Sequence, residues 1–267
     1  MKQIFIDRRR FIRFAGAAAV AGGTLVGSNR AMAVPRRLAR GHRVVVLDPG
    51  HGGIDPGCIG CRGTYEKDIA LETVRELAAL LEETGRYHVK LTRRDDEFVA
   101  LEDRVARARA DDADLLLSIH ADALPEERMR GASVYTLSDR ASDREAAELA
   151  ARENGADFVA GVDLSRHAPE VSHILFDLAR RETNNQSIRL AQDVVSELGR
   201  RVRLLEHTHR SAGFVVLKAP DVPSALVEIG CLSNRDEEEQ LLAAAHRRLV
   251  AVGLLHSIDD FFAAEQV

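Results

Sequence analysis

Two histidines follow apolar runs of the kind that form buried strands. His51 lies in the segment DPGHGG (residues 48–53), directly after Val44–Leu47, and His120 ends the run DLLLSI (residues 114–119). Such runs indicate buried strands, and the Pro-Gly after the first one ends it with a turn. Ligands of open α/β sheets bind at the carboxyl ends of the strands. Because imidazole is the commonest metal ligand, the sequence predicts a metal site that includes His51 and His120.

A carboxylate is available as a third ligand. Glu66 follows the glycine-rich loop after His51 and begins the helix that the apolar spacing predicts over residues 69–81. Catalytic zinc sites combine three protein ligands with a fourth position left for water. His51, Glu66 and His120 are therefore the predicted ligands of one zinc ion per chain. Their spacing is not H-E-x-x-H, so it does not identify the site by itself.

A second carboxylate interrupts an apolar run. Glu228 lies in Ala225–Gly230, which is otherwise apolar, and a buried carboxylate is costly unless it is paired or used in chemistry. Burial would raise its pKa toward the range that suits a proton shuttle. We therefore expect Glu228 to be the general base. The alternative is a carboxylate at a strand end, hydrogen-bonded to Ser233 or Asn234.

These residues must be positioned by a sheet with alternating helices. Strands are predicted at residues 44–47, 87–92, 114–119, 132–137, 214–217 and 225–229, and helices at 69–81, 101–108, within 139–199, and at 236–262. Strands that alternate with helices are typical of an α/β fold. We predict a single open, mostly parallel twisted sheet of about six strands, with helices on both faces and a helical insertion at 139–199.

The N-terminus has the features of an export signal. Arg8–Arg10 precede an Ala/Gly-rich run, and Ala31-Met32-Ala33 matches an A-x-A cleavage pattern. The paired arginines predict a twin-arginine signal peptide over residues 1–33, which exports folded cargo to the periplasm. A linker (34–42) and one domain (43–267) would follow. The alternative is an uncleaved signal anchor, although the run is poor in strongly apolar residues and a span needs about 20 of them.

Charge and cysteine content exclude some functions and leave others open. Without residues 1–33 the chain keeps 31 basic and 41 acidic residues, a net charge of −10, which disfavours a nucleic-acid partner. We expect no stable membrane span after signal cleavage, and a monomer. Cys58 and Cys61 form a C-x-x-C pair, but with only Cys231 besides them no four-thiolate zinc site can form. A local disulfide and free thiols both remain possible.

Four ordered motifs resemble those of the zinc-dependent N-acetylmuramoyl-L-alanine amidases (Amidase_3 type). They are DPGHGG (48–53), EKD (66–68), SIHAD (118–122) and VEIGCLSN (227–234). The resemblance implies that His51, Glu66 and His120 bind zinc and that Glu228 is catalytic. It also implies hydrolysis, by zinc-activated water, of the peptidoglycan amide between N-acetylmuramic acid and L-alanine of the stem peptide. Such an enzyme would serve in cell-wall remodelling and daughter-cell separation.

The insertion resembles that of the Gram-negative cell-division amidases, through ARENGAD (151–157) and LKAPDVPS (217–224). In that subgroup a helical insertion blocks the zinc cleft until a degenerate LytM-type protein displaces it. The resemblance implies that Glu153, or else Glu148, is an inhibitory zinc ligand. Both could instead be solvated helix charges. Residues 34–42 leave no room for the wall-targeting domain of many division amidases, so septal targeting stays open.

Other functions and contacts remain possible. A zinc peptidase or aminoacylase acting on small amides would use the same chemistry, and a wall-binding protein could retain a silent site. Arg62 and Asn234 are candidate substrate contacts because they lie in loops next to the motifs. His207 and His209 could approach the cleft, although a place in a loop is the simpler expectation.

Overall fold

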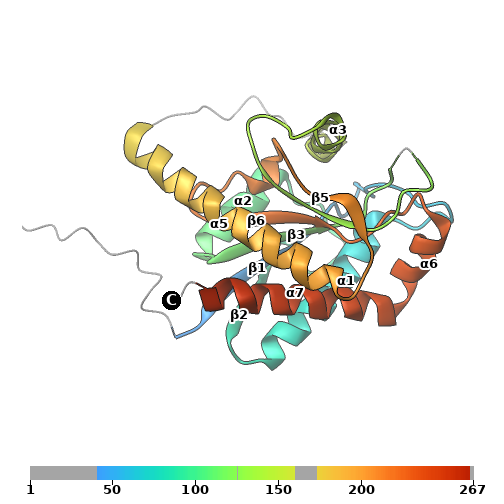
Figure 1. Ribbon diagram of the computed structural model, residues 1–267, viewed down its shortest axis with the longest axis horizontal. Coiled ribbons are helices and arrows are strands. Elements are labelled where there is room, and N and C mark those ends of the chain that lie inside the picture. The colour runs from blue at the N-terminus through green and yellow to red at the C-terminus, as the bar shows by residue number, and fades with distance from the viewer. Residues whose placement is uncertain (1–40, 125, 160–172, 265–267) are drawn as a thin grey trace, which may run out of the picture. The chain divides into compact units, whose positions relative to one another are not determined.

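The computed structural model describes residues 41–124, 126–159 and 173–264 (Figure 1). The predicted signal peptide (1–33) and most of the predicted linker lie outside the described residues. The strands are β1 (Arg43–Pro49), β2 (Tyr87–Leu91), β3 (Leu115–His120), β4 (Ala132–Leu137), β5 (Leu204–Ala212) and β6 (Ser224–Glu228). The helices are α1 (Glu66–Glu83), α2 (Leu101–Ala110), α3 (Arg144–Glu153), α4 (Ala156–Val159), α5 (His173–Gly199), α6 (Arg235–Leu242) and α7 (Ala244–Ala264), with a 3-10 helix η4 (Val215–Leu217).

The described strands form one six-stranded sheet in the order β2-β1-β3-β6-β4-β5. The pairings are parallel except that β4 runs antiparallel to β6. The carboxyl ends of β1, β3 and β6 therefore meet at one edge, whereas β4 ends at the opposite edge. This confirms the predicted α/β class and the mostly parallel, open sheet.

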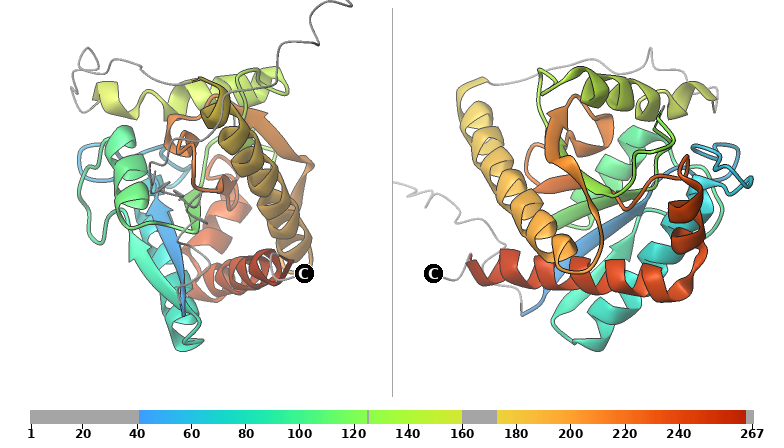
Figure 2. Two further views of the ribbon diagram at one scale, coloured as in Figure 1. Left: turned by 90° about the vertical axis from the view of Figure 1, so that its left-hand side faces the viewer. Right: turned by 45° about the vertical axis from the view of Figure 1, so that its right-hand side comes forward.

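Helices cover both faces of this sheet. Side chains of α1, α5 and α7 pack with Val45, Leu117 and Val227 in the main core, whereas α2 and α3 pack on the other face with Val46, Leu226 and their neighbours. Figure 2 shows α3 and α7 on opposite sides of the sheet. The β-branched and leucine side chains of β1 and β3 fill both layers, which explains why these strands are apolar along their whole length.

The structure corrects two of the predicted elements and adds one strand that was not predicted. The run Phe214–Leu217 is not a strand: its side chains are buried beside α3, but Val215–Leu217 form η4. The sixth strand is instead β5, which sequence patterning missed. As an edge strand, β5 has several exposed side chains and shows no strict alternation. The predicted closing helix is divided into α6 and α7, which are bent by 81° at Ala243.

The break between α6 and α7 has a local cause. Ala243 has an extended backbone, and Arg247 donates hydrogen bonds to the carbonyl oxygens of Leu241 (2.8 Å) and Leu242 (2.6 Å) at the end of α6. These contacts satisfy carbonyls that a helix end leaves free. No single helix of the described chain is long and apolar enough to cross a membrane; only the bent pair α6–α7 passes by length and composition.

Candidate metal centre

Four buried side chains meet at the carboxyl edge of β1, β3 and β6. One ligand atom from each of His51, Glu66, His120 and Glu153 lies within 4.8 Å of the others. His51 Nε2 lies 3.2 Å from a carboxylate oxygen of Glu66 and 3.2 Å from one of Glu153. His120 Nδ1 lies 3.0 Å and 3.1 Å from the same two carboxylates. The structure therefore brings together the three residues predicted as ligands and the carboxylate of Glu153.

The glycine-rich loop allows this close approach. A Cβ atom at Gly50 would lie 2.3 Å from the His120 ring, so only glycine lets the loop pass against that imidazole. A Cβ atom at Gly57 would meet His51 at 2.6 Å and Glu66 at 2.7 Å, and its φ of +68° favours glycine as well. The loop glycines therefore provide the space in which the three side chains converge.

Backbone amides and a second carboxylate orient the donors. Glu66 begins α1, and its two carboxylate oxygens accept hydrogen bonds from the amides of Cys58 (2.9 Å) and Ala121 (3.0 Å). His51 Nδ1 lies 2.7 Å from Asp55 Oδ2, so the other ring nitrogen, Nε2, is directed at the cluster. A carboxylate on the distal nitrogen is the usual partner of a metal-binding histidine. Sequence reasoning missed Asp55, although its position four residues after His51 could have suggested it.

The negative charge of the two carboxylates in the cluster favours a bound cation. Burial disfavours charged imidazoles, but the carboxylates of Glu66 and Glu153 outweigh it: they raise the pKa of His51 well above its ordinary value, and that of His120 to about 10. Burial opposes ionisation of Glu153 too, yet the two histidines lower its pKa to about 2. With neutral imidazoles the site has two negative charges, which two protons or one divalent cation would balance.

The donor set fits zinc. Two imidazoles with carboxylates match catalytic zinc sites in proteins. No hydrogen bond of good geometry reaches the buried His51 Nε2 from any described residue, which leaves this nitrogen free to bind a metal ion. Three of the four side chains would suffice for a catalytic site, and Glu153 is the fourth donor of the cluster.

Glu228 lies beside the cluster. It pairs with His120 across β3 and β6, so the two side chains project from the same face of the sheet. Its Oε2 accepts a hydrogen bond from the Asp122 amide (2.8 Å), whereas Oε1 is buried without a partner among the described residues. Burial raises the pKa of Glu228 well above its ordinary value. The geometry does not show the alternative hydrogen bonds to Ser233 or Asn234: the Ser233 hydroxyl accepts from Leu124, and Asn234 caps α6.

The insertion reaches the cluster through α3. Glu153 is the last residue of α3, and the preceding Arg152 donates a hydrogen bond to Asp122 Oδ2 at 2.5 Å. The Asn154 side chain follows and contacts the backbone of Gly213 and Val215. The other candidate, Glu148, is exposed and lies 3.6 Å from Arg144. Of the two glutamates weighed from the sequence, Glu153 therefore belongs to the cluster and Glu148 does not.

The remaining predicted positions lie elsewhere. Arg62 pairs with Glu239 (2.7 Å), and the Asn234 side chain donates to Glu127 O, so both are held by structural contacts. Cys58, Cys61 and Cys231 are free thiols, and their Sγ atoms contact backbone carbonyl oxygens.

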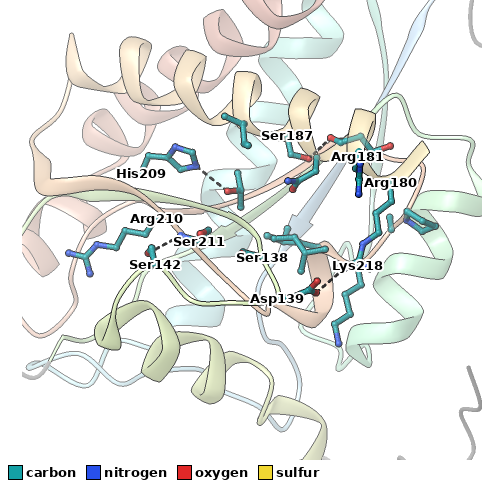
Figure 3. Close-up of a pocket in the computed structure, with 18 residues that line it drawn as sticks. Ser138, Asp139, Ser142, Arg180, Arg181, Ser187, His209, Arg210, Ser211 and Lys218 are labelled. Atoms are coloured by element: carbon teal, nitrogen blue, oxygen red, sulfur yellow. Dashed lines mark hydrogen bonds and ion pairs between the residues drawn. The ribbon is translucent and has the colours of Figure 1, made fainter. Parts of the chain in front are cut away.

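His207 and His209, for which the sequence favoured a place in a loop over an approach to the cleft, lie instead in β5. His209 Nε2 contacts Thr136 Oγ1 at 3.1 Å and lines a pocket of about 620 Å³ at the opposite edge of the sheet (Figure 3). The side chains of Arg180, Arg181 and Lys218 line the same pocket, and Arg180 pairs with Asp139 at 3.0 Å. None of the predicted metal or catalytic residues lines it.

Comparisons with known proteins agree with this geometry. Residues 45–260 match the family model of N-acetylmuramoyl-L-alanine amidases. The chain is 38% identical over 271 residues to the amidase AmiA of Escherichia coli, covering 96% of this chain and 92% of AmiA. It is 41% identical over 221 residues to an E. coli amidase AmiC, covering 82% of this chain but only 53% of AmiC.

Solved structures support the same assignment. The catalytic domain of CwlV, an N-acetylmuramoyl-L-alanine amidase from Bacillus (Paenibacillus) polymyxa, superposes with a TM-score of 0.58 at 25% identity, covering 83% of this chain and 98% of CwlV. The CwlD amidase of Clostridioides difficile, solved in complex with the GerS lipoprotein, shares the fold with a TM-score of 0.62 at 23% identity, covering 84% and 100%. The chain belongs to the N-acetylmuramoyl-L-alanine amidase family.

Proposed function

We propose that this protein hydrolyses the amide between N-acetylmuramic acid and L-alanine of the peptidoglycan stem peptide. The observation that supports this most directly is the buried cluster of His51, Glu66 and His120 beside Glu228, in a chain of this amidase family. Peptidoglycan is then the substrate, and cell-wall remodelling with daughter-cell separation is the cellular role.

The predicted ligands and Glu228 have different roles in the proposed hydrolysis. A zinc ion held by His51, Glu66 and His120 would polarise the scissile carbonyl and acidify the attacking water. Glu228 is anchored through Oε2 and has Oε1 free, so Oε1 takes the proton from the water. The same oxygen then delivers that proton to the nitrogen of the leaving L-alanine. Burial raises the pKa of Glu228, which makes its carboxylate a stronger base toward the proton of the attacking water.

The protein is inhibited at rest in this proposal. Glu153 lies where the water and the substrate carbonyl would have to enter, and Arg152 fastens the end of α3 to Asp122. Displacing α3 would remove a carboxylate from the cluster and open it to substrate. A degenerate LytM-type activator is the expected displacing partner. The solved complex of CwlD with a lipoprotein shows that an amidase of this fold can bind another protein.

Location follows from the N-terminal residues. The paired arginines and the A-x-A pattern of residues 1–33 support export to the periplasm in the folded state through the twin-arginine route. A periplasmic enzyme would meet peptidoglycan there, and a folded export cargo could already hold its metal ion.

The test compares two α3 variants on purified peptidoglycan. Glu153→Ala should release stem peptides with a free L-alanine amino terminus at least tenfold faster than wild type, because the inhibitory carboxylate is gone. Glu148→Ala is the matched control: it removes an exposed glutamate from the same helix and should leave the rate unchanged.

The products separate the amidase from the other zinc hydrolases. Shortened stem peptides would indicate a peptidase, and no product from zinc-loaded Glu153→Ala would contradict catalysis altogether. Equal release by wild type and Glu153→Ala would leave the amidase assignment intact but overturn the inhibition by α3.

A further inference from the structure

Two buried arginines hold the backbone on which His51 is placed. Arg104 donates to the carbonyl oxygens of Pro49 (2.7 Å) and His51 (2.7 Å), and Arg93 donates to those of Pro49 (3.0 Å) and Gly50 (2.7 Å). Three consecutive carbonyls thus point at two guanidinium groups. Arg93 and Arg104 are 1% and 2% exposed, which places them among the largest fully buried side chains of the described chain.

The backbone at this point needs outside support. β1 ends at Pro49, so the following carbonyls leave the sheet ladder while still buried, and a buried carbonyl without a donor is unfavourable. His51 also has a φ of +59°, a left-handed conformation that is unfavourable for a residue with a Cβ atom. Strained residues persist where surrounding contacts enforce them, and such residues concentrate at functional sites.

Burial of the two charged guanidinium groups is energetically unfavourable. Arg104 has one carboxylate partner, Asp48 (2.8 Å), which also accepts from Thr92 and Ser118. Arg93 forms no salt bridge with any described residue. Its other hydrogen bonds go to the carbonyls of Lys67 and Asp95, and burial together with the charge of Arg104 lowers its pKa to about 10. Burying two guanidinium groups is costly, and the hydrogen bonds that they donate to the buried Pro49–His51 carbonyls offset that cost.

The two predicted histidine ligands are therefore positioned by different means. His120 is the last residue of β3, and its backbone is fixed by the ladders with β1 and β6. His51 lies beyond its strand, and side chains fix it: Arg93 and Arg104 on the backbone of the loop, and Asp55 on the ring. A change in the arginines would rotate the His51 backbone and move Nε2 away from the cluster.

We propose that Arg104 and Arg93 are positioning residues of the metal site, whose forked guanidinium groups hold the Pro49–His51 backbone in the one conformation that aims His51 Nε2 at the cation. This inference rests on the metal site of the proposed function. Lysine preserves the charge but cannot donate to two carbonyls in the fixed geometry of a guanidinium group. Arg104→Lys should therefore weaken zinc binding more than it weakens folding.

Zinc affinity of the purified chain, measured by competition with a chromophoric chelator, is the readout. We expect Arg104→Lys and Arg93→Lys to lower the affinity about 10- to 100-fold, as loss of a residue that orients a metal ligand does. Arg107→Lys is the matched control: Arg107 lies on the same helix and also donates to a backbone carbonyl, that of Thr92, outside the His51 loop. Its zinc affinity should stay within twofold of wild type. Thermal unfolding of the metal-free proteins shows which variants fold.

The outcomes distinguish a positioning role of the two arginines from a role in folding alone. Folded lysine variants that bind zinc as wild type does, or an equal loss in Arg107→Lys, would overturn the positioning role. Failure of both Arg104→Lys and Arg93→Lys to fold would also overturn it, because the arginines would then serve the fold alone. Failure of the wild type to bind zinc would instead contradict the metal site of the proposed function.

Discussion

The two edges of the sheet differ in how their polar groups are satisfied. At the carboxyl ends of β1, β3 and β6, buried donors and acceptors are crowded together, and His51 Nε2 and Glu228 Oε1 lack hydrogen-bond partners in the described chain. A third such atom, Asp114 Oδ1, lies before β3 at the other end of the strands, 3.6 Å from Arg43. At the opposite edge, the pocket of about 620 Å³ is lined by apolar and polar side chains, and the polar ones form internal pairs such as Arg180 with Asp139 and His209 with Thr136 (Figure 3).

This difference shows that open volume is a poor guide to chemistry in this molecule. Glu153 contacts both His51 and His120 at the predicted reactive edge, whereas the pocket lies at the opposite edge. Buried polar groups without partners cost free energy, and they are retained where a ligand or a reaction uses them. Two of the three unsatisfied side-chain atoms of the described chain therefore lie at the predicted functional edge, whereas the cavity does not.

The largest expected effect is the loss of catalysis on removing the base. Glu228→Gln keeps the size and the anchoring contact with the Asp122 amide but cannot accept a proton, so turnover should fall about 10²- to 10⁴-fold. The measurement is peptide release from purified peptidoglycan in the Glu153→Ala background, with zinc content determined in parallel. We expect the double variant to keep its zinc and to lose its activity. Turnover close to that of Glu153→Ala alone would show that Glu228 is not the general base.

Metal removal should have the next largest effect, on stability. Zinc at about 1,000 times its Kd would stabilise the folded chain by about 4 kcal/mol. For a protein of this size, chelation would then lower the unfolding midpoint by roughly 10 °C. Midpoints measured with chelator and after readdition of zinc test this, with His120→Ala as the variant that should show no response. A midpoint that chelation does not change would indicate that the cluster holds no metal ion.

The smallest effect is expected at the opposite edge. Arg180→Ala removes an ion pair whose side chains are 46% and 89% exposed, and exposed pairs contribute about 1 kcal/mol or less. Unfolding free energy should change by less than that, and zinc affinity and peptide release should match the parent protein. A tenfold change in zinc affinity would mean that the pocket and the metal site are energetically coupled, so the two edges would not be independent.

Much of the site could be predicted because strand ends and charge follow local rules. The apolar runs before His51 and His120 and the carboxylate inside Ala225–Gly230 place three functional side chains at strand ends without any tertiary information. β5 and η4 could not be assigned in this way. An edge strand need not alternate, and an apolar run such as Phe214–Leu217 is buried equally well in a 3-10 turn.

The supporting residues could be found only in the folded chain. Arg104 lies on the buried side of α2 with Leu101 and Ala108, where an arginine is unusual, yet the sequence does not show that its partners are carbonyls more than fifty residues away. Arg152 raises the same difficulty, because it acts on Asp122, a side chain that the fold places beside it. Asp55 differs, because its position four residues after His51 is visible in the sequence.

The α/β class, the family resemblance and the residue types available for a zinc site could be inferred without coordinates, because they depend on short apolar runs and local motifs. The tertiary structure decided which carboxylate of α3 reaches the cluster, how His51 is held in its left-handed conformation, and that the open pocket lies at the opposite edge from the reactive groups. These features depend on contacts between distant segments, which form only when helices and strands pack in one particular arrangement.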